Sequence, residues 1–251
     1  MKRGLISIPQ MVGLATVVAI IAILQGASQA GLLNPFIVPA PSRIAASFPD
    51  LILDQGLLRD TVLTFGETLA ATVAAVSVGL PIGWLLYRYR PLHEIWSPWV
   101  AAMAAAPLVL LYPLFLVVIG RNLGTVICMA ALSAMPPIIL RACDGLQAVR
   151  PTLVAVGRSF GLNAHQRFWK IELPAAAPAL INGIRLGLMF ALINVVAIEY
   201  LIVIGGLGRE ISTLSDRFDI PAVYAAIVFV IVVNAVFFYA TERLEQWLKP
   251  V

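Results

Sequence analysis

The chain has 251 residues, of which 61% are hydrophobic and only 12% are charged. Soluble domains carry about 25% charged residues, so this composition excludes an ordinary soluble protein. The formal net charge of +4 does not indicate nucleic-acid binding, because no basic run is interleaved with stacking aromatic residues. Membrane proteins concentrate Lys and Arg in their cytoplasmic loops, and this tendency explains the excess of basic over acidic residues.

Long stretches without any charged residue predict that the chain crosses a bilayer several times. They lie between Arg3 and Arg43, Glu67 and Arg88, Glu94 and Arg121, Arg121 and Arg141, and Asp219 and Glu242. Each can hold the roughly 20 apolar residues that span a bilayer. Cys128 and Cys143 fall in one predicted span, where a disulfide is geometrically impossible, and no metal-ligand spacing occurs. We therefore predict an integral membrane protein without a metal site.

The first apolar run, about residues 11–28, follows Lys2 and Arg3. A cleaved signal peptide is one interpretation of this start. We favour a retained first span, because the run is long and no small-residue cleavage site directly precedes a polar segment. The Pro-rich stretch 33–60 then predicts an external loop, with a short surface helix from Ser42 onward.

Five further spans are predicted along the rest of the chain, at about residues 61–87, 96–119, 123–140, 179–204 and 222–240. Pro107 and Pro113 lie inside the third span and predict kinks, which membrane helices tolerate where neighbours satisfy the freed carbonyls. The Gly-rich stretch 205–221 predicts an outer loop. The expected fold class is thus an all-α membrane protein with six transmembrane helices.

Two of these spans carry small residues at helical spacing, which favours close helix packing. One stripe contains Thr68, Thr72, Ala75, Gly79 and Gly83, and the other contains Gly183, Gly187, Ala191 and Asn194.

The distribution of basic residues predicts which side each loop faces. With both termini inside, the inner set is Lys2, Arg3, Arg88, Arg90, Arg141, Arg150, Arg158, Arg167, Lys170, Arg243 and Lys249. The outer set is Arg43, Arg59, Arg121, Arg209 and Arg217. Because Lys and Arg concentrate on the cytoplasmic side, we expect both termini in the cytoplasm.

The most polar segment between spans, residues 151–174, then faces the cytoplasm. Pro151 suits the first turn of a helix that Gly161 can close. Asn163 can cap a second short helix over 164–172, which must stop before Pro174. Leu153, Val156 and Phe160 form an apolar stripe on the first helix, while Phe168, Trp169 and Ile171 give the second an apolar surface. We interpret this segment, the elbow, as a surface offered to a partner.

The elbow resembles the cytoplasmic EAA loop of binding-protein-dependent ABC importer permeases. Gly161 and the closing Ile171-x-Leu173-Pro174 match that loop, whereas its Glu-Ala-Ala start corresponds to Ala155, Val156 and Gly157, so the acid is absent. Stretches 39–42, 79–83, 183–187 and 206–208, with Pro107, Pro113, Gly120 and Gly145-Leu146, are similar to the nitrate, sulfonate and taurine branch. That branch often has Arg where this chain has Glu67, and Arg141 and Arg150 also depart from its pattern.

This resemblance implies a type I ABC importer permease, with one permease domain over residues 1–251 and a coupling-loop region at 150–174. The partners that it implies are two ABC ATPase subunits, a second permease copy or a homologous permease, and a soluble substrate-binding protein. It also implies that the chain lies in the lipid of a bacterial-type inner membrane. Without a G-x-x-x-x-G-K-S/T motif, the chain is expected to be no enzyme and to bind no cofactor, with ATP and Mg used by the partner ATPase.

Two groups of candidate residues follow. The resemblance assigns ATPase coupling to Val156, Gly157, Arg158, Phe160, Gly161, Phe168, Trp169, Ile171, Leu173 and Pro174. Phe160, Phe168 and Trp169 are the expected anchors of a helix-in-groove contact, unless they are aromatic belt residues.

The candidates for the translocation path are Glu67, Arg185, Asn194 and Glu199, because polar groups in spans are costly. The two acids are gate residues, paired with Arg59 or Arg209, or interfacial acids that reach water. Arg185 is expected either to attract an anionic substrate or to brace helices by donating hydrogen bonds to their carbonyl groups. Asn194 has a pore role or makes an interhelical hydrogen bond.

The expected function is ATP-driven import of a small solute, of a sulfonate, taurine, nitrate or other small organic anion type. An ion-coupled secondary transporter is the alternative, and an intramembrane enzyme is a third. The alternative predicts discontinuous helices in matching halves, and no internal duplication is visible. The enzyme needs a nucleophile–base or metal constellation, and none assembles in the sequence.

Overall fold

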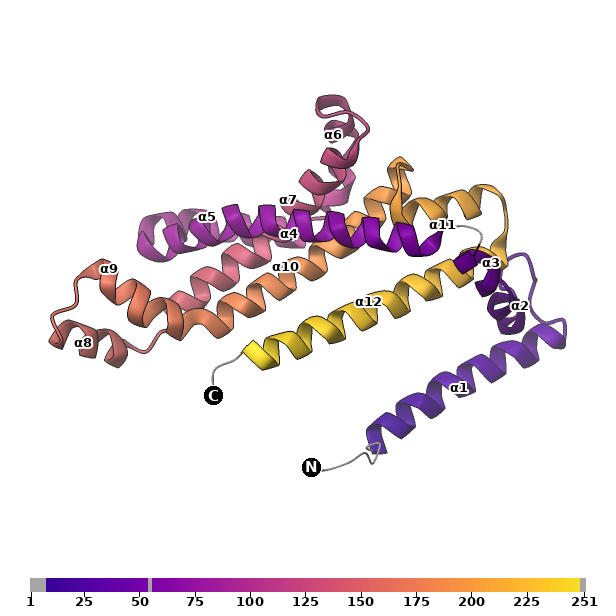
Figure 1. Cartoon of the computed structure of the whole chain (residues 1–251), viewed down its shortest axis with the longest axis horizontal. Coiled ribbons are helices and arrows are strands. Elements are labelled where there is room, and N and C mark those ends of the chain that lie inside the picture. The colour runs from indigo at the N-terminus through magenta and orange to yellow at the C-terminus, as the bar shows by residue number, and fades with distance from the viewer. Residues whose placement is uncertain (1–7, 54–55, 249–251) are drawn as a thin grey trace.

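The computed structural model describes residues 8–53 and 56–248, and within them the chain is helical with no strand (Figure 1). Three short helices are α2 (Pro41–Ala46), α3 (Phe48–Leu53) and α11 (Gly206–Asp216). The long helices are α1 (Ile8–Gln29), α4 (Leu57–Arg88), α7 (Leu123–Gln147), α10 (Leu173–Ile202) and α12 (Ile220–Leu248). The remainder are α5 (Arg90–Ala105), a 3-10 turn (Leu108–Leu111), α6 (Tyr112–Val118), α8 (Pro151–Ser159), α9 (Ala164–Arg167) and a π-helical turn (Phe168–Glu172).

Five of the described helices are long and apolar enough to cross a membrane, and the number is six when one bent pair of helices is counted as a single span. The pair joins 90–105 to 108–118 through a bend of 88°, so the third predicted span is broken rather than kinked. The break falls at Pro107, as the sequence indicated, whereas Pro113 lies in the first turn of α6, where its missing N–H needs no partner. The all-α membrane fold is confirmed.

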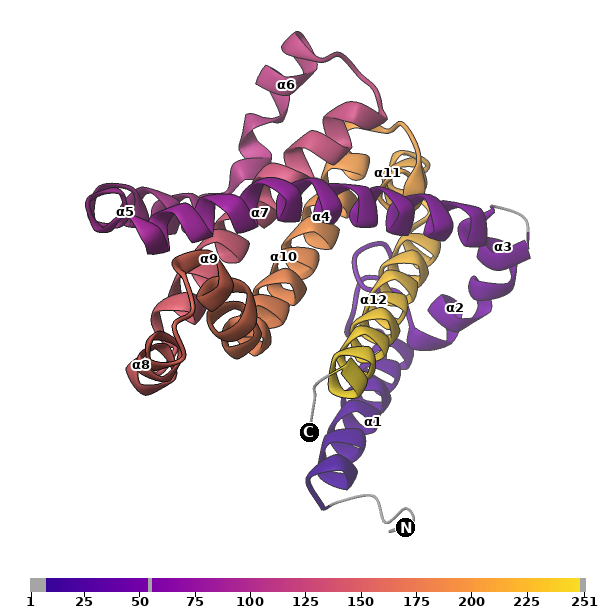
Figure 2. The same ribbon diagram turned by 60° about the vertical axis from the view of Figure 1, so that its left-hand side comes forward.

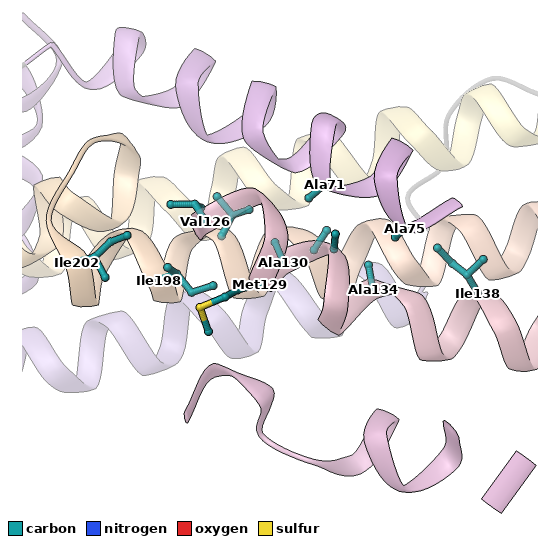
Figure 3. Packing of buried hydrophobic residues seen from close by; sticks show 12 residues of the cluster. Ala71, Ala75, Val126, Met129, Ala130, Ala134, Ile138, Ile198 and Ile202 are labelled. Atoms are coloured by element: carbon teal, nitrogen blue, oxygen red, sulfur yellow. The ribbon is translucent and has the colours of Figure 1, made fainter. Parts of the chain in front are cut away.

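The core lies where α4, α7 and α10 pack together, and it is built from small and aliphatic side chains (Figure 3). The predicted small-residue stripes face this contact. A Cβ built on Gly187 would lie 2.6 Å from Ile138 Cδ1, and one on Gly183 would lie 2.7 Å from Arg141 Cβ. Because only glycine fits at these positions, the backbones of α7 and α10 approach closely.

Gly83 of α4 lies against the backbone of α7, since an added Cβ would lie 2.8 Å from the Ile139 carbonyl oxygen. We expect Gly83→Ala to destabilise the purified protein by about 2 kcal/mol, the usual cost of overpacking a tight core. Gly66→Ala in the same helix is the matched control, because nothing lies within 4 Å of its added Cβ. Thermal unfolding in detergent compares the two variants, and equal midpoints would contradict the prediction.

The periphery is looser than the core. Helix α1 is mostly exposed from Met11 onward and touches the remainder through α2, where Gln25 accepts a hydrogen bond from the Ser42 amide at 3.1 Å. Helices α2 and α3 occupy the stretch in which a short surface helix was predicted, and they pack on α12. Figure 2 shows α1 and α12 together on one side of the central helices.

Two sequence-based expectations about helix limits were wrong. The elbow's second helix does not stop before Pro174, because the π-helical turn continues directly into α10 and leaves Pro174 in that helix's first turn. The predicted outer loop 205–221 contains α11, which buries Leu207 and Leu214. Its glycines allow close approach to neighbouring helices instead of unwinding the chain.

Candidate functional site

The elbow has the local structure that the sequence predicts at its turns. Gly161 has a φ of +71°, the left-handed conformation that ends α8. Asn163 accepts a hydrogen bond from the Gln166 amide at 2.8 Å, while the Gln166 side chain accepts one from the Asn163 amide at 3.1 Å. This capping box starts α9 and reverses the chain, so α8 and α9 lie together at one end of the bundle (Figure 1).

The elbow presents apolar side chains to its surroundings. Phe160 is 79% exposed and Trp169 is 56% exposed, and Leu153 and Val156 of α8 are also exposed. The exposed coupling candidates are Val156, Arg158, Phe160, Gly161, Trp169 and Pro174. An apolar patch of this kind marks a surface that a partner or lipid covers.

The other coupling candidates hold the elbow together. Gly157 is buried, and a Cβ added there would lie 2.5 Å from Ile171 Cδ1. Ile171, Leu173 and Phe168 are half-buried. The Phe168 ring meets Trp84 of α4 edge-on at a centroid distance of 6.0 Å. Gly157 and Ile171 therefore shape the elbow from inside rather than offering contact area.

Glu172 is a buried acid in the elbow that the sequence analysis did not single out. Its carboxylate accepts from Arg167 Nε at 2.8 Å and from the Tyr87 hydroxyl at 3.1 Å. Burial of a charge is tolerated where it is paired and hydrogen-bonded in this way. The sequence signal that could have identified it was an acidic residue between apolar residues, five positions after Arg167. A cleft of about 450 Å³ adjoins the cluster, between the end of α4 and the elbow.

At the opposite end of the bundle, Glu199 binds three elements together. It is 1% exposed, accepts from the Thr64 hydroxyl of α4 at 2.8 Å, and accepts from the Gly208 amide of α11 at 2.9 Å. The Leu207 amide in turn donates to Thr64 Oγ1 at 3.0 Å. A carboxylate at a helix start satisfies free amides and complements the helix dipole. Gly206, with a φ of +79°, lies directly against this carboxylate, where any Cβ would collide.

Glu67 lies beside Glu199 and is also buried, but its oxygens make no hydrogen bond of ordinary geometry within the described residues. Glu67 and Glu199 were predicted to pair with Arg59 or Arg209. The pairing with Arg209 was wrong. That guanidinium binds Asp60 at 2.7 Å and Glu210 at 3.4 Å. Burial raises the pKa of the Glu210 carboxyl, and the charge of Arg209 opposes that rise. Glu199 instead joins α10 to α4 and α11.

Arg185 and Asn194 occupy different surroundings along α10. Arg185 forms an ion pair with Glu242 of α12 at 3.1 Å, so its bracing contact is a carboxylate on another helix. Asn194 lines a cavity of about 230 Å³ together with Pro107 and Ser133. Its amide donates to the Phe190 carbonyl of its own helix at 2.9 Å, so the expected interhelical hydrogen bond is absent from the described structure.

Residues 67–250 match the family described as binding-protein-dependent transport system inner membrane component. The chain belongs to this family. It is thus a multi-pass inner membrane component of the ABC transporter permease type, and this confirms the resemblance drawn from the elbow and its neighbouring motifs.

Several curated relatives cover most of the chain. A probable ABC transporter permease of Brucella melitensis is 25% identical over 84% of this chain and 87% of its own length. A putative aliphatic sulfonates transport permease of Bacillus subtilis is 28% identical, covering 95% and 86%. A riboflavin transport system permease of Chloroflexus aurantiacus is 26% identical, covering 85% and 80%. These relatives are all named as transport permeases, but the solutes in their names differ.

Solved structures show the same fold. A chain of the inward-facing MetNI methionine ABC transporter superposes with a TM-score of 0.68 at 22% sequence identity, covering 77% of this chain and 96% of that one. This likeness establishes the type I importer permease architecture for the fold.

Proposed function

We propose that this permease moves a small anion that a soluble binding protein delivers, namely a sulfonate, taurine, a nitrate-like ion or another small organic anion. The anion class is supported by the sulfonate permease, whose similarity extends over 95% of this chain. Asn194 and Ser133 supply polar groups to a cavity at the broken span, where a solute can be hydrogen-bonded within the bilayer.

The observation that carries the ATP-driven part of the proposal is the exposed apolar elbow. Two partner ATPase subunits, which use ATP and Mg, would each seat one elbow in a groove, with Phe160 and Trp169 as anchors. A second copy of this chain or a homologous permease would complete the pair. The elbow end and both termini then face the cytoplasm, in agreement with the bias of Lys and Arg.

Uptake by cells with and without the chain tests the proposal. We expect accumulation of labelled taurine that depends on the chain, stops when ATP is depleted and is reduced by competing alkanesulfonates. Riboflavin and glycine betaine serve as chemically different competitors. Uptake that persists without ATP but collapses with the ion gradient would replace the proposal with an ion-coupled secondary transporter. Dependence on ATP with riboflavin as the effective competitor would overturn the anion class alone.

A further inference from the structure

The elbow is joined to α4 by side chains, although in sequence it leads into α10. Tyr87 near the end of α4 donates its hydroxyl hydrogen to Glu172 at 3.1 Å, and Trp84, one turn earlier, meets Phe168 edge-on. Both elbow residues belong to the π-helical turn Phe168–Glu172. Single π-helical turns inside α-helices are rare and occur frequently at functional sites.

Helix α8 packs against the same π-helical turn. The side of Gly157 is pressed against Ile171, and an added Cβ would lie 3.4 Å from Arg167 Cγ. Arg167 in turn forms an ion pair with Glu172 at 2.8 Å, and both side chains are mostly buried. A displacement of α8 therefore reaches Glu172 through a packed contact and an ion pair, without passing through solvent.

Helix α4 is held at its far end as well. Asp60 binds Arg209 of α11 at 2.7 Å, and the Thr64 hydroxyl binds Glu199 of α10. Both sets of contacts belong to one helix of 32 residues with Pro81 in its interior, and a single packed helix can transmit motion between distant sites. The cleft of about 450 Å³ between α4 and the elbow leaves space for displacement at the elbow end.

We propose that Glu172 is a positioning residue that transmits movement of the elbow to α4, with Tyr87 as its partner. An ATPase that moves the elbow would then shift α4 together with α10, and the change at the outer end would follow through Thr64 and Asp60. This inference rests on the proposed coupling of the elbow to an ATPase. It assigns the transmission to two residues beneath the apolar surface rather than to the surface itself.

Accessibility of a single cysteine tests the transmission without any need for the solute. The full chain, isolated with its partner ATPase, carries Cys128→Ser, Cys143→Ala and Ala106→Cys, so that a water-soluble maleimide reports on the cavity at the broken span, which Ala106 lines. We expect ATP with vanadate to change the alkylation rate in this background. Glu172→Gln and Tyr87→Phe should each reduce that change roughly tenfold, as for loss of one hydrogen bond or ion-pair contact of a charged group, while ATP hydrolysis continues.

Two matched variants serve as controls. Tyr89→Phe alters a neighbouring tyrosine whose hydroxyl has no hydrogen bond in the described part of the chain, and Glu94→Gln alters an exposed acid paired with Arg90. Both should retain the ATP-dependent change. A full response in Glu172→Gln and Tyr87→Phe, or loss of the ATPase from the Tyr87→Phe complex, would overturn the inference. Absence of any response in the parent background would refute the ATP-driven function itself.

Discussion

Phe160→Ala should separate this permease from its ATPase while leaving the chain folded. Phe160 is the most exposed aromatic residue of the elbow, at 79%. Truncating a central aromatic anchor costs about 2–4 kcal/mol of binding, which corresponds to an affinity loss of roughly 30- to 1,000-fold. We expect the purified variant to retain its unfolding midpoint, to copurify with little ATPase and to support almost no uptake.

Phe36→Ala is the matched control for this experiment. Phe36 is 83% exposed but lies between α1 and α2, far from the elbow in the fold. It should retain both the ATPase and the uptake. Normal ATPase binding by the Phe160 variant would show that its ring belongs to the aromatic belt at the membrane surface, the alternative interpretation of these residues.

Thr64→Ala should loosen α11 from the bundle and cost about 2–4 kcal/mol of stability. The hydroxyl donates to the Glu199 carboxylate and accepts from the Leu207 amide, so its removal takes a hydrogen bond from a buried charge and leaves a buried amide unsatisfied. In a chain of this size, each kcal/mol shifts the unfolding midpoint by about 2–4 °C. Thermal unfolding in detergent should therefore show a decrease of roughly 5–15 °C.

Thr68→Ala provides the comparison, since both threonines are fully buried in α4 and differ only in what the hydroxyl binds. Thr68 donates to the Thr64 carbonyl within its own helix at 2.7 Å, so its loss leaves no other helix without a partner. We expect a decrease of about 1 kcal/mol or less, and Thr64→Ser should recover most of the lost stability. Equal shifts for the two alanine variants would show that the contact between α4, α10 and α11 contributes little.

Local features of the chain were predicted well because their physical causes are local. The length of an apolar run sets a span, and small residues four positions apart set a packing face, so the helices and the stripes around Gly79 and Gly183 follow from the sequence. The capping box at Asn163 and the left-handed Gly161 arise within a few residues. The same local spacing was sufficient to indicate the family.

Other features depend on residues that meet only in the folded chain. Glu199 lies 135 positions from Thr64, and Glu172 lies 85 positions from Tyr87, so neither partnership has a signal at short range. The glycines near Gly206 were interpreted as a loop because their use, close approach of a helix start to a buried carboxylate, is visible only in three dimensions.

The sequence by itself determined that this protein is a multi-pass helical permease with an apolar elbow, because hydrophobic length and small-residue spacing act within each segment. Only the tertiary structure decided how the elbow is attached to α4, that the third span bends by 88° instead of being slightly kinked, and that α11 is a buried helix. Those outcomes depend on satisfying buried polar groups between distant segments, and in a low-dielectric interior such groups must find a partner wherever the fold brings one.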